Sequence, residues 1–485
     1  MQQLEHKEFK NLIDGEWLAC ESGTYPNVNP ADNSDIVGRF QDSGQAEARA
    51  AIEAAQRAFK AWRAKPVTAR AAILVKAAEL LQERADQIGQ ELTREEGKPY
   101  AQARGEVLRS AQTLRFYAIE GQTYTGETYP QDDANMLVHS QPEPLGVVTV
   151  IAPWNFPISI PSRKIAPALI TGNTVVFKPS TDAPLSGYRL VEALVDAGVP
   201  AGVLNFVTGR ASRVGETLTA SPEIRGVTFT GSTQAGEAIH RSASMTTRLQ
   251  MELGGKNPLL VMDDADLDVA VDLTVKGGLA LTGQACTGTS RVLIHRSVRE
   301  AYVEKLLDRI AKLKVGNGMQ DGIDLGPMAT ERQLQTVLEY VDIGKKEATH
   351  VTGGDRLTGE GFDQGYFISP AVFTDVRQNM RIAQEEIFGP VIAVIDVDSY
   401  EEAIEMANDT PYGLSASIVT NNAKLAHHFV DAIEAGTVKV NRTTTGNLIN
   451  APFGGIKQSS TATFRESGRA GLDFFVQVKT VYRGV

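Results

Sequence analysis

The sequence is poor in cysteine and has no excess of positive charge. Only two cysteines, Cys20 and Cys286, occur among 485 residues, which is too few for a disulfide framework and typical of a reducing compartment. Lysine and arginine total 48 against 59 aspartate and glutamate residues, giving a formal net charge of −11. Because nucleic-acid binders carry a basic surface, we expect a cytoplasmic protein with no nucleic-acid partner.

The sequence also lacks a segment suited to a membrane. Residues 1–18 carry both charge signs and no apolar stretch, so no secretory signal is expected. Residues 144–162 contain no charge, but four prolines interrupt them and exclude a straight lipid-facing helix. The histidines show no metal-ligand spacing with either cysteine. We therefore expect neither a membrane partner nor a metal.

Length and hydrophobic patterning predict a multidomain α/β protein. The chain exceeds the usual single-domain size, and its composition, 42% hydrophobic and 22% charged, is that of an ordinary globular protein. Residues 44–120 have the apolar spacing of helices. From 145 to 253 short β-branched runs alternate with amphipathic segments, which predicts βαβ units and a parallel sheet. A second α/β region is expected from about 255 to 436.

Individual elements follow from the same patterns. The predicted strands are 146–151, 174–177, 203–207, 226–229, 248–253, 292–295, 371–373 and 391–397. The predicted helices of the first region are 158–170, 184–197, 211–219 and 232–243. From Phe474 to Tyr482 apolar and polar residues alternate as in a half-buried strand. A free strand edge favours pairing with another element or another subunit, and the pattern leaves both open.

The G-x-G-x-x-G signature of many dinucleotide-binding folds does not occur in the sequence. The nearest substitute is F-T-G-S-T-Q-A-G at 229–236, where a predicted strand ends at Gly231 and a helix begins at Ser232. Such a turn offers backbone N–H groups and a positive helix end to a phosphate. Ser232 equally fits an ordinary N-cap.

Three side chains are candidates for chemistry. Cys286 lies among small residues that let a substrate approach the sulfur, although a lone cysteine is more often inert and only a thiolate attacks. Glu252 ends a predicted strand between apolar neighbours, where a carboxylate has the raised pKa of a general base; the alternative is a surface glutamate. Asn155 lies between two prolines and suits an oxyanion donor, unless it only stabilises its own turn.

In order along the chain, these segments resemble the motifs of the aldehyde dehydrogenase superfamily. They are P-W-N-F-P at 153–157, F-K-P-S at 177–180, F-T-G-S-T-Q-A-G at 229–236, E-L-G-G-K-N-P at 252–258, G-Q-A-C-T-G at 283–288, E-E-I-F-G-P-V at 385–391 and P-F-G-G-I-K at 452–457. The resemblance covers nearly the whole chain. It implies cofactor binding without G-x-G-x-x-G.

The resemblance also implies an α/β fold of two Rossmann-like parallel-sheet domains with a small β oligomerisation arm. Residues 1–121 and 142–253 would form the NAD(P)-binding domain and residues 254–436 the catalytic domain. Residues 122–141 and 437–485 would form the arm and the C-terminal strand. A homodimer or homotetramer is expected.

By resemblance, Cys286 is the nucleophile that attacks the aldehyde carbon. The Asn155 amide and the Cys286 backbone N–H would hold the oxyanion, and expulsion of hydride to the nicotinamide would leave a thioester. Glu252 would activate the water that hydrolyses this thioester to a carboxylic acid. Lys178, grouped with the catalytic residues, would bind the adenosine ribose, and Ser232 the pyrophosphate. The other implied cofactor contacts are Ile151, Pro153, Trp154, Ser180, Gly231, Glu252, Gly254, Glu386 and Phe388.

Cofactor preference is expected to depend on Thr181, which stands where relatives strict for NAD often carry glutamate. A short neutral side chain does not repel a 2′-phosphate, and Arg210 or Arg213 would neutralise it. The alternative is that both arginines face solvent. We expect NADP to be accepted, with NAD also usable.

For the substrate, Arg163 occupies the helix that lines the aldehyde channel in the superfamily. Enzymes acting on dicarboxylic semialdehydes have an arginine there that pairs with the distal carboxylate; the alternative is a surface charge. Residues 441–450, which include Asn447, look most like those of 2-oxoglutarate semialdehyde dehydrogenases. Ala280 stands where succinate semialdehyde enzymes usually carry a second arginine. Phe156 and Phe453 complete the expected substrate contacts.

The expected function is the NAD(P)-dependent oxidation of 2-oxoglutarate semialdehyde to 2-oxoglutarate. Alternatives within the family are a succinate semialdehyde dehydrogenase and a broad-specificity aldehyde dehydrogenase. A cofactor-independent thiol esterase using Cys286 and Glu252 is an alternative of another class. A non-enzymatic structural protein is the third alternative, against which the intact catalytic residues argue.

Overall fold

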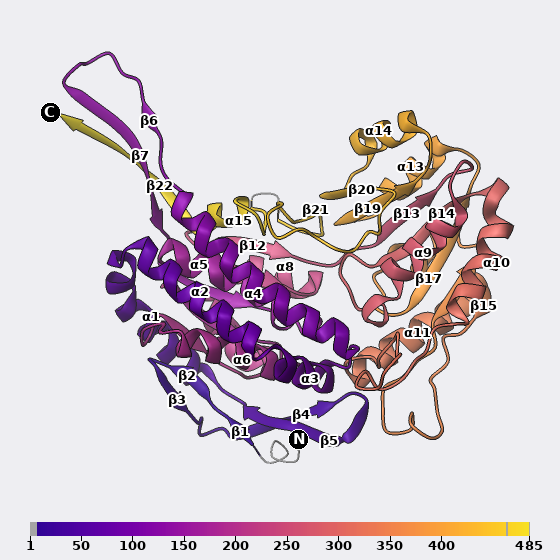
Figure 1. The fold of residues 1–485 in the computed structure, drawn as a ribbon, viewed down its shortest axis with the longest axis horizontal. Helices are drawn as coiled ribbons and strands as arrows, with labels where there is room; N and C mark the ends of the chain where they lie inside the picture. The colour runs from indigo at the N-terminus through magenta and orange to yellow at the C-terminus, as the bar shows by residue number, and fades with distance from the viewer. Residues whose placement is uncertain (1–6, 462–463, 485) are drawn as a thin grey trace.

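Two seven-stranded sheets and a projecting three-stranded sheet organise the chain (Figure 1). The structure, a computed structural model, describes residues 7–461 and 464–484. Residues 1–6, 462–463 and 485 of the predicted domains therefore lie outside the described residues. The predicted fold class, α/β with two parallel-sheet regions, is confirmed.

The N-terminal region combines short strands with four long helices. The strands, which the sequence analysis did not predict, are β1 (Glu8–Phe9), β2 (Asn11–Ile13), β3 (Glu16–Leu18), β4 (Thr24–Asn29) and β5 (Asp32–Gln41). The helices are α1 (Gln45–Ala64), α2 (Val67–Glu83), α3 (Ala85–Glu96) and α4 (Tyr100–Thr123). Small residues on the inner face of α1, such as Ala48, Ala51 and Ala55, are fully buried and let it approach the first sheet closely. The helical prediction for residues 44–120 is confirmed.

The first sheet has the strand order β12-β11-β8-β9-β10-β2-β3. Its parallel strands are β8 (Val147–Ile151), β9 (Thr174–Lys178), β10 (Leu204–Phe206), β11 (Ile224–Thr230) and β12 (Arg248–Glu252). The helices between them are α5 (Ser159–Thr171), α6 (Pro184–Asp196), α7 (Ala211–Ala220) and α8 (Thr233–Ser242). All nine correspond to predicted elements. The strand order reverses between the neighbours β8 and β11, and ligands of such sheets bind at the carboxyl ends of the strands at this switch point.

The second sheet has the strand order β15-β16-β17-β14-β13-β19-β20. Its strands are β13 (Asn257–Val261), β14 (Thr289–His295), β15 (Thr349–Thr352), β16 (Ala371–Thr374), β17 (Val391–Val397), β19 (Ser415–Val419) and β20 (Thr437–Val440). Its helices are α9 (Leu267–Gly278), η1 (Ala280–Gly283), η2 (Arg296–Val298), α10 (Arg299–Ile310), α11 (Glu331–Glu347), α12 (Arg381–Gln384), α13 (Tyr400–Asn408) and α14 (Ala423–Ala432). β14, β16 and β17 contain the predicted strands. β20, which the predicted boundaries group with the arm, is an edge of this sheet.

Each seven-stranded sheet, with the helices that cover it, forms one lobe of the molecule. The projecting three-stranded sheet forms an arm that extends beyond both lobes, with the C-terminus near its tip (Figure 1). It consists of β6 (Thr128–Tyr129), β7 (Met136–Pro144) and β22 (Val476–Gly484), in the order β22-β7-β6. The predicted C-terminal strand is confirmed and pairs with β7. It begins at Val476, after the short helix α15 (Ala470–Asp473) and Phe474. In the single chain Val476 is buried but Val478 is 67% and Tyr482 69% exposed, so burial of the apolar face by another subunit stays a prediction.

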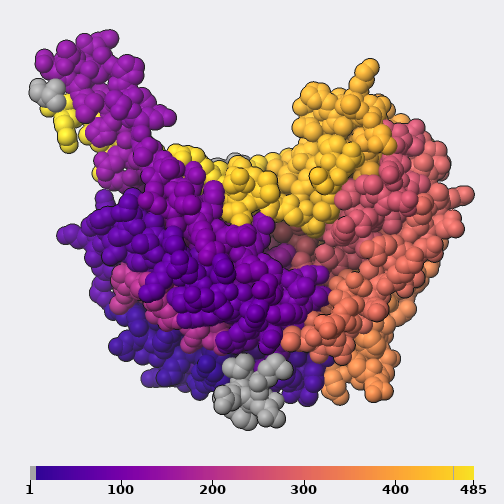
Figure 2. Space-filling model, viewed as in Figure 1, coloured from indigo at the N-terminus to yellow at the C-terminus, as the bar shows by residue number. Residues whose placement is uncertain are grey.

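The segment between β20 and the arm joins the two lobes. Figure 2 shows this segment, in yellow, lying across the molecule between the N-terminal lobe and the orange lobe. β21 (Ile456–Lys457) pairs with β18 (Tyr412–Gly413) of the second lobe, while Ser460 forms a bridge with Glu252 of the first sheet. No helix within residues 7–461 and 464–484 has the length and apolar character needed to cross a membrane.

Candidate active site

A cavity of about 270 Å³ lies where the two lobes meet, at the switch point of the first sheet. Its walls come from the end of β11 and the loops after β8, β11 and β12, and from two loops and the helix α11 of the second lobe. The lining residues are Pro153, Trp154, Asn155, Thr230, Gly231, Ser232, Leu253, Gly254, Cys286, Arg332, Gln333, Thr336, Glu386, Ile387 and Phe388. The structure therefore brings together residues from the five motifs at 153–157, 229–236, 252–258, 283–288 and 385–391.

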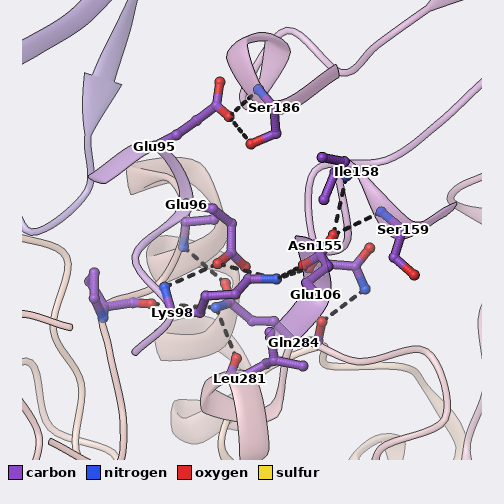
Figure 3. Close-up of polar contacts among 12 residues, drawn as sticks. Glu95, Glu96, Lys98, Glu106, Asn155, Ile158, Ser159, Ser186, Leu281 and Gln284 are labelled. Carbon is purple, nitrogen blue, oxygen red and sulfur yellow. Dashed lines mark hydrogen bonds and ion pairs between the residues drawn. The ribbon is translucent and has the colours of Figure 1, made fainter. Parts of the chain in front are cut away.

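Asn155 is held rigidly at the cavity wall. The parallel strand β8 ends at Ile151, and the proline-rich loop carries the chain to α5. The Asn155 side chain is 3% exposed, and its Nδ2 donates to the backbone carbonyl of Gln284 at 3.0 Å (Figure 3). An amide nitrogen carries two hydrogens, so one N–H remains for another acceptor.

Cys286 follows a strained turn. Leu281 and Thr282 have φ angles of 54°, in the left-handed region that non-glycine residues rarely adopt. Cys286 retains partial exposure, but protein atoms surround its thiol, and this burial raises the thiol pKa to about 12. The positive charge of Arg163 opposes the increase, while Glu386 and Glu252 add to it. Attack by this sulfur consequently requires a group that removes its proton.

Glu252 ends β12 as a buried carboxyl group. Its Oε1 accepts a hydrogen bond from Ser460 Oγ at 3.0 Å, and its Oε2 is buried with no hydrogen-bond partner in the part of the chain that the structure describes. Burial raises the pKa of Glu252 well above its usual range, and the nearby Glu466 carboxylate raises it further. A carboxylate with a raised pKa holds a proton more strongly and is a stronger general base.

A buried ion pair that the sequence analysis missed lies behind Glu252. Lys164 Nζ contacts Glu466 Oε1 and donates to Thr228 Oγ1 at 2.9 Å. Lys164 is fully buried, and burial lowers the pKa of its ammonium group. The sequence signal was a lysine inside the apolar segment 158–170; its partner is 302 positions away.

Ser232 is the N-cap of α8, because its Oγ accepts from the Ala235 N–H at 3.3 Å. The residue also lines the cavity, and its role toward a phosphate stays a prediction. Thr230 Oγ1, at the end of β11, is buried and finds no hydrogen-bond partner among residues 7–461 and 464–484. The helix end and this hydroxyl are polar groups suited to a phosphate or ribose ligand.

Glu386 and Phe388 form the opposite wall with Gly254. Glu386 Oε1 accepts from the Gly255 N–H at 3.0 Å, and burial raises the pKa of Glu386 to about 7. A Cβ at Gly254 would lie 2.2 Å from Glu386 Oε2, so a larger residue there would displace this carboxyl group. The Phe388 ring meets the Trp154 ring edge to face, with centroids 5.4 Å apart.

Lys178 lies at the end of β9, paired in register with Ile151 of β8. It is buried, and its Nζ donates to the Pro179 carbonyl at 2.9 Å. Burial lowers the ammonium pKa to about 8. An ammonium group has three donors, so it can serve further acceptors. In the loop that follows, Ser180 Oγ accepts from Asp182 N at 3.2 Å and Thr181 is half-buried.

Arg210 and Arg213 do not simply face solvent. Both form ion pairs with Asp42, at 3.7 Å for Arg210 NH2 and 2.9 Å for Arg213 NH1. The Arg210 side chain stays 65% exposed. Their role toward a 2′-phosphate remains a prediction.

Arg163 lies over Phe453, with 5.5 Å between the guanidinium carbon and the ring centroid. Its Nε is buried and without a hydrogen-bond partner among the described residues. Arg109 of α4, which the sequence analysis missed, is close enough that the charge of Arg163 lowers its pKa, after the larger effect of burial. Arg109 NH2 donates to the Asn447 carbonyl.

Phe156 lies under the Lys98 ammonium group, with 4.6 Å between the ring centroid and the nitrogen.

The described residues contain no group of three or more His, Cys, Asp or Glu side chains that could hold a metal ion.

Sequence reasoning did not find several contacts around the proposed catalytic groups, among them those made by Ser460, Lys98 and the Lys164–Glu466 pair. Each contacts its partner across the fold rather than along the chain.

Comparisons with known proteins match nearly the whole chain. The sequence model described as "Aldehyde dehydrogenase family" matches residues 17–481. A Bacillus subtilis protein named alpha-ketoglutaric semialdehyde dehydrogenase is 44% identical over 481 residues, which cover 99% of this chain and 98% of that protein. A structure of 3,6-anhydro-L-galactose dehydrogenase in complex with NADP has a TM-score of 0.95 and 34% identity, covering 98% of this chain and 100% of that one. A structure of Staphylococcus aureus betaine aldehyde dehydrogenase in complex with NAD+ has a TM-score of 0.96 and 32% identity, covering 100% and 95% of the two chains.

Proposed function

Because the chain belongs to the aldehyde dehydrogenase family, we propose that it oxidises 2-oxoglutarate semialdehyde to 2-oxoglutarate with NADP or NAD as hydride acceptor. The observation that carries this proposal is the meeting of Cys286 and Asn155 at one cavity, with Glu252 and Arg163 near enough to change the thiol pKa. The nucleophile, an oxyanion donor, a base and a cation for the substrate carboxylate are thus adjacent.

Cys286 Sγ forms a bond with the aldehyde carbon, and the carbonyl oxygen becomes an oxyanion. The free Asn155 N–H and the Cys286 backbone N–H donate to it. Because the thiol pKa is about 12 in the structure, its proton must leave as the sulfur attacks. Glu252, with an unpartnered buried oxygen, is the group that takes it.

The residues around the cavity fit a dinucleotide. Lys178 would bind ribose hydroxyls, the α8 N-terminus at Ser232 the pyrophosphate, and Glu386 with Phe388 the nicotinamide ribose and ring. The contacts assigned to Ile151, Pro153, Trp154, Ser180, Gly231 and Gly254 complete this surface. When bound, the nicotinamide supplies the hydride acceptor for the oxidation.

Glu252 has its second role after oxidation, once the proton that it took from Cys286 has passed to solvent. The acyl group remains on Cys286 as a thioester, and water attacks its carbon while Glu252 accepts the water proton. The C–S bond breaks, the carboxylic acid leaves, and the thiol regains a proton.

Both cofactors are proposed because solved relatives carry NADP in one case and NAD+ in another. The neutral Thr181 leaves room for a 2′-phosphate, and the exposed Arg210 is 3.7 Å from its acidic partner. We propose that NADP is accepted and that NAD is also used.

The semialdehyde assignment rests on the cations of the substrate side. Arg163 and Arg109 are close to one another, and a guanidinium group binds a carboxylate in two-point geometry. Phe156, Asn447 and Phe453 would surround the carbon chain. The name of the Bacillus subtilis relative supports the 2-oxo acid, and succinate semialdehyde is the second candidate because it carries the same distal carboxylate.

Three further assignments belong to this proposal. The first sheet and its helices hold the cofactor, and the second lobe supplies Cys286. The exposed apolar residues of the arm, Val478 and Tyr482 among them, suit contact with a second copy in a homodimer or homotetramer. The scarcity of cysteine supports a cytoplasmic location.

The test is a comparison of kcat/KM for 2-oxoglutarate semialdehyde, succinate semialdehyde and an uncharged aldehyde of similar length, at saturating NADP. Wild type should prefer the charged semialdehydes, and Arg163→Ala should remove the preference. Equal values for all three aldehydes would contradict the substrate assignment. Ester hydrolysis without any cofactor-dependent oxidation would favour the thiol esterase instead.

A further inference from the structure

A buried ion pair joins Lys98, in the corner between α3 and α4, to Glu106 of α4 and contacts the loop that carries Asn155 (Figure 3). Lys98 and Glu106 are 3% and 5% exposed. Lys98 Nζ lies 2.6 Å from Glu106 Oε2 and donates to the backbone carbonyl of Asn155 at 2.7 Å. A hydrogen bond from a charged donor is about twice as strong as a neutral one, so the ammonium group fixes the Asn155 backbone firmly.

The other oxygen of Glu106 holds the end of the same loop. Glu106 Oε1 accepts from the backbone N–H groups of Ile158 at 3.1 Å and Ser159 at 3.0 Å, where α5 begins. No side chain at the N-cap position of α5 performs this role. The first N–H groups of a helix lack intrahelical partners and favour a negative charge. One ion pair thus holds residues 155–159 at both ends.

The side chain of Asn155 is fixed independently from the second lobe. The backbone carbonyl of Gln284 accepts a hydrogen bond from the side-chain amide of Asn155 at 3.0 Å. The Gln284 side chain in turn donates to the Leu281 carbonyl at 3.1 Å and accepts from Ala329 N at 2.9 Å. Asn155 is therefore held from one side by Lys98 and from the other by the cysteine loop.

The corner that carries Lys98 also touches the second lobe. Gly97 ends α3 with a φ of 98°, and a Cβ there would lie 2.6 Å from Pro327 Cγ. The backbone N–H of Tyr100 donates to the Gly318 carbonyl at 2.9 Å. The Lys98 backbone is consequently fixed against the lobe that carries Cys286, and its side chain transmits that position to the Asn155 carbonyl.

We infer that Lys98 is a positioning residue for the oxyanion site: its ammonium group, anchored by Glu106, holds the Asn155 backbone so that the remaining amide N–H faces the oxyanion formed at Cys286. This inference rests on the proposed role of Asn155. Lys98 is not a catalytic residue, because it contacts the loop through the Asn155 carbonyl and the Phe156 ring. Small displacements of an oxyanion donor reduce the rate strongly.

The test is a double-mutant cycle on the full chain with Lys98→Met, Asn155→Ala and the double variant. Removal of an oxyanion donor lowers kcat by about 10²–10³-fold, and we expect Asn155→Ala to fall in this range. Lys98→Met should lower kcat by about tenfold or more in wild type, but by less than about twofold when Asn155 is already absent. The dissociation constant for NADP, measured by fluorescence titration, should not change. Effects that multiply in the double variant, or an unchanged kcat in Lys98→Met, would overturn the inference.

A second variant keeps the inference testable if Lys98→Met fails to fold. Lys98→Met leaves the Glu106 charge buried and unpaired, which destabilises proteins strongly. Lys98→Met combined with Glu106→Gln removes both charges of the pair and keeps an acceptor oxygen for the start of α5; Glu96→Gln is added because the buried Glu96 Oε2 lies 3.8 Å from Lys98 Nζ. The resulting variant should fold, bind NADP and show the same non-additivity with Asn155→Ala; additive effects would again count against the inference. Lys98→Arg, which keeps the charge, should recover part of the lost kcat.

A matched control separates positioning from general stability. Arg189 and Glu91 form another largely buried pair in the same lobe, 2.7 Å apart, with no contact to residues 155–159. Arg189→Met should lower Tm but leave the effect of Asn155→Ala unchanged. If Arg189→Met reduced the effect of Asn155→Ala on kcat as much as Lys98→Met does, the inference would be overturned. Full activity in Asn155→Ala itself would instead contradict the proposed function.

Discussion

The side chain of Asn155 donates to the backbone carbonyl of Gln284, two residues before Cys286, across 129 positions of sequence and 3.0 Å of space. The bond joins the loop after β8 in the first lobe to the cysteine loop of the second. Because both loops line one cavity, this bond fixes the proposed oxyanion donor relative to the proposed nucleophile.

The reactivity of the thiol should depend on Arg163. Burial raises the Cys286 pKa to about 12, and the positive charge of Arg163 lowers it. Arg163→Ala should therefore raise the pKa further and slow alkylation by iodoacetamide at each pH between about 7 and 10. Cys20→Ser is the background for this measurement, because it leaves one thiol in the chain. Alkylation at an unchanged rate would show that Arg163 does not act on the sulfur.

Removal of the Glu252 carboxylate should block deacylation. General-base catalysis contributes about 10²–10⁴-fold, so Glu252→Gln should lower steady-state kcat by a factor in that range. Because the same carboxylate is proposed to take the Cys286 proton, the first turnover should be slowed as well, without a burst of reduced cofactor. Stopped-flow absorbance would follow this turnover, and a normal steady-state rate would exclude Glu252 as the base.

Ser460 should adjust the acid limb of the pH profile. Its hydroxyl donates to Glu252 and lowers the pKa of that carboxyl group, against the larger effect of burial. Ser460→Ala should raise the Glu252 pKa, so that less of the basic form exists at a given pH. The acid limb of kcat against pH should consequently shift to higher pH. A shift to lower pH, or none, would contradict this role.

Arg109 should contribute to binding of the distal carboxylate. Arg109→Ala is expected to raise KM for a semialdehyde by about 10–100-fold, the range of one lost charged contact, with a much smaller effect on an uncharged aldehyde. Arg115→Ala is the matched control on the same helix, because Arg115 NH2 donates to Gln82 at the exposed surface. Equal losses for charged and uncharged aldehydes would indicate only a disturbed Asn447 loop.

Cofactor preference should respond in opposite directions to two substitutions. Thr181→Glu adds a negative charge near the expected 2′-phosphate and should lower the NADP/NAD ratio of kcat/KM by about tenfold or more, as like-charge contacts disfavour binding. Asp42→Asn should raise the ratio, because it releases Arg210 and Arg213 from their ion pairs. If neither substitution moves the ratio, this region does not select the cofactor.

Glu96, beside Lys98, should make stability depend on pH. Burial raises its pKa from 4.5 to about 8, so the folded protein favours the protonated carboxyl group. The associated stability is complete below pH 4.5 and is lost as pH rises through about 8. Glu96→Gln lacks this titration, and its Tm relative to wild type should increase between these pH values. A constant difference in Tm would contradict the raised pKa.

The sequence by itself determined the parallel strands β8 to β12 of the first sheet, the helices between them and the residue types of the motifs. Each of these depends on neighbours in the chain: a β-branched run between turns, an asparagine between two prolines, a cysteine among small residues. The short strands β2, β13, β19 and β20 escaped prediction because their pairing, rather than a distinctive pattern, makes them strands. The C-terminal strand had the expected alternation, yet only the projection of the arm decided that Val478 and Tyr482 are exposed in the single chain.

Only the tertiary structure decided which charges meet. Lys98 contacts Asn155 over 57 positions, Lys164 contacts Glu466 over 302, and Ser460 contacts Glu252 over 208. Electrostatic energy depends on distance through space and on exclusion of water, neither of which the order of residues records. The sequence therefore identifies a thiol, a carboxylate and an amide, and the fold sets the proton affinities and directions with which they act.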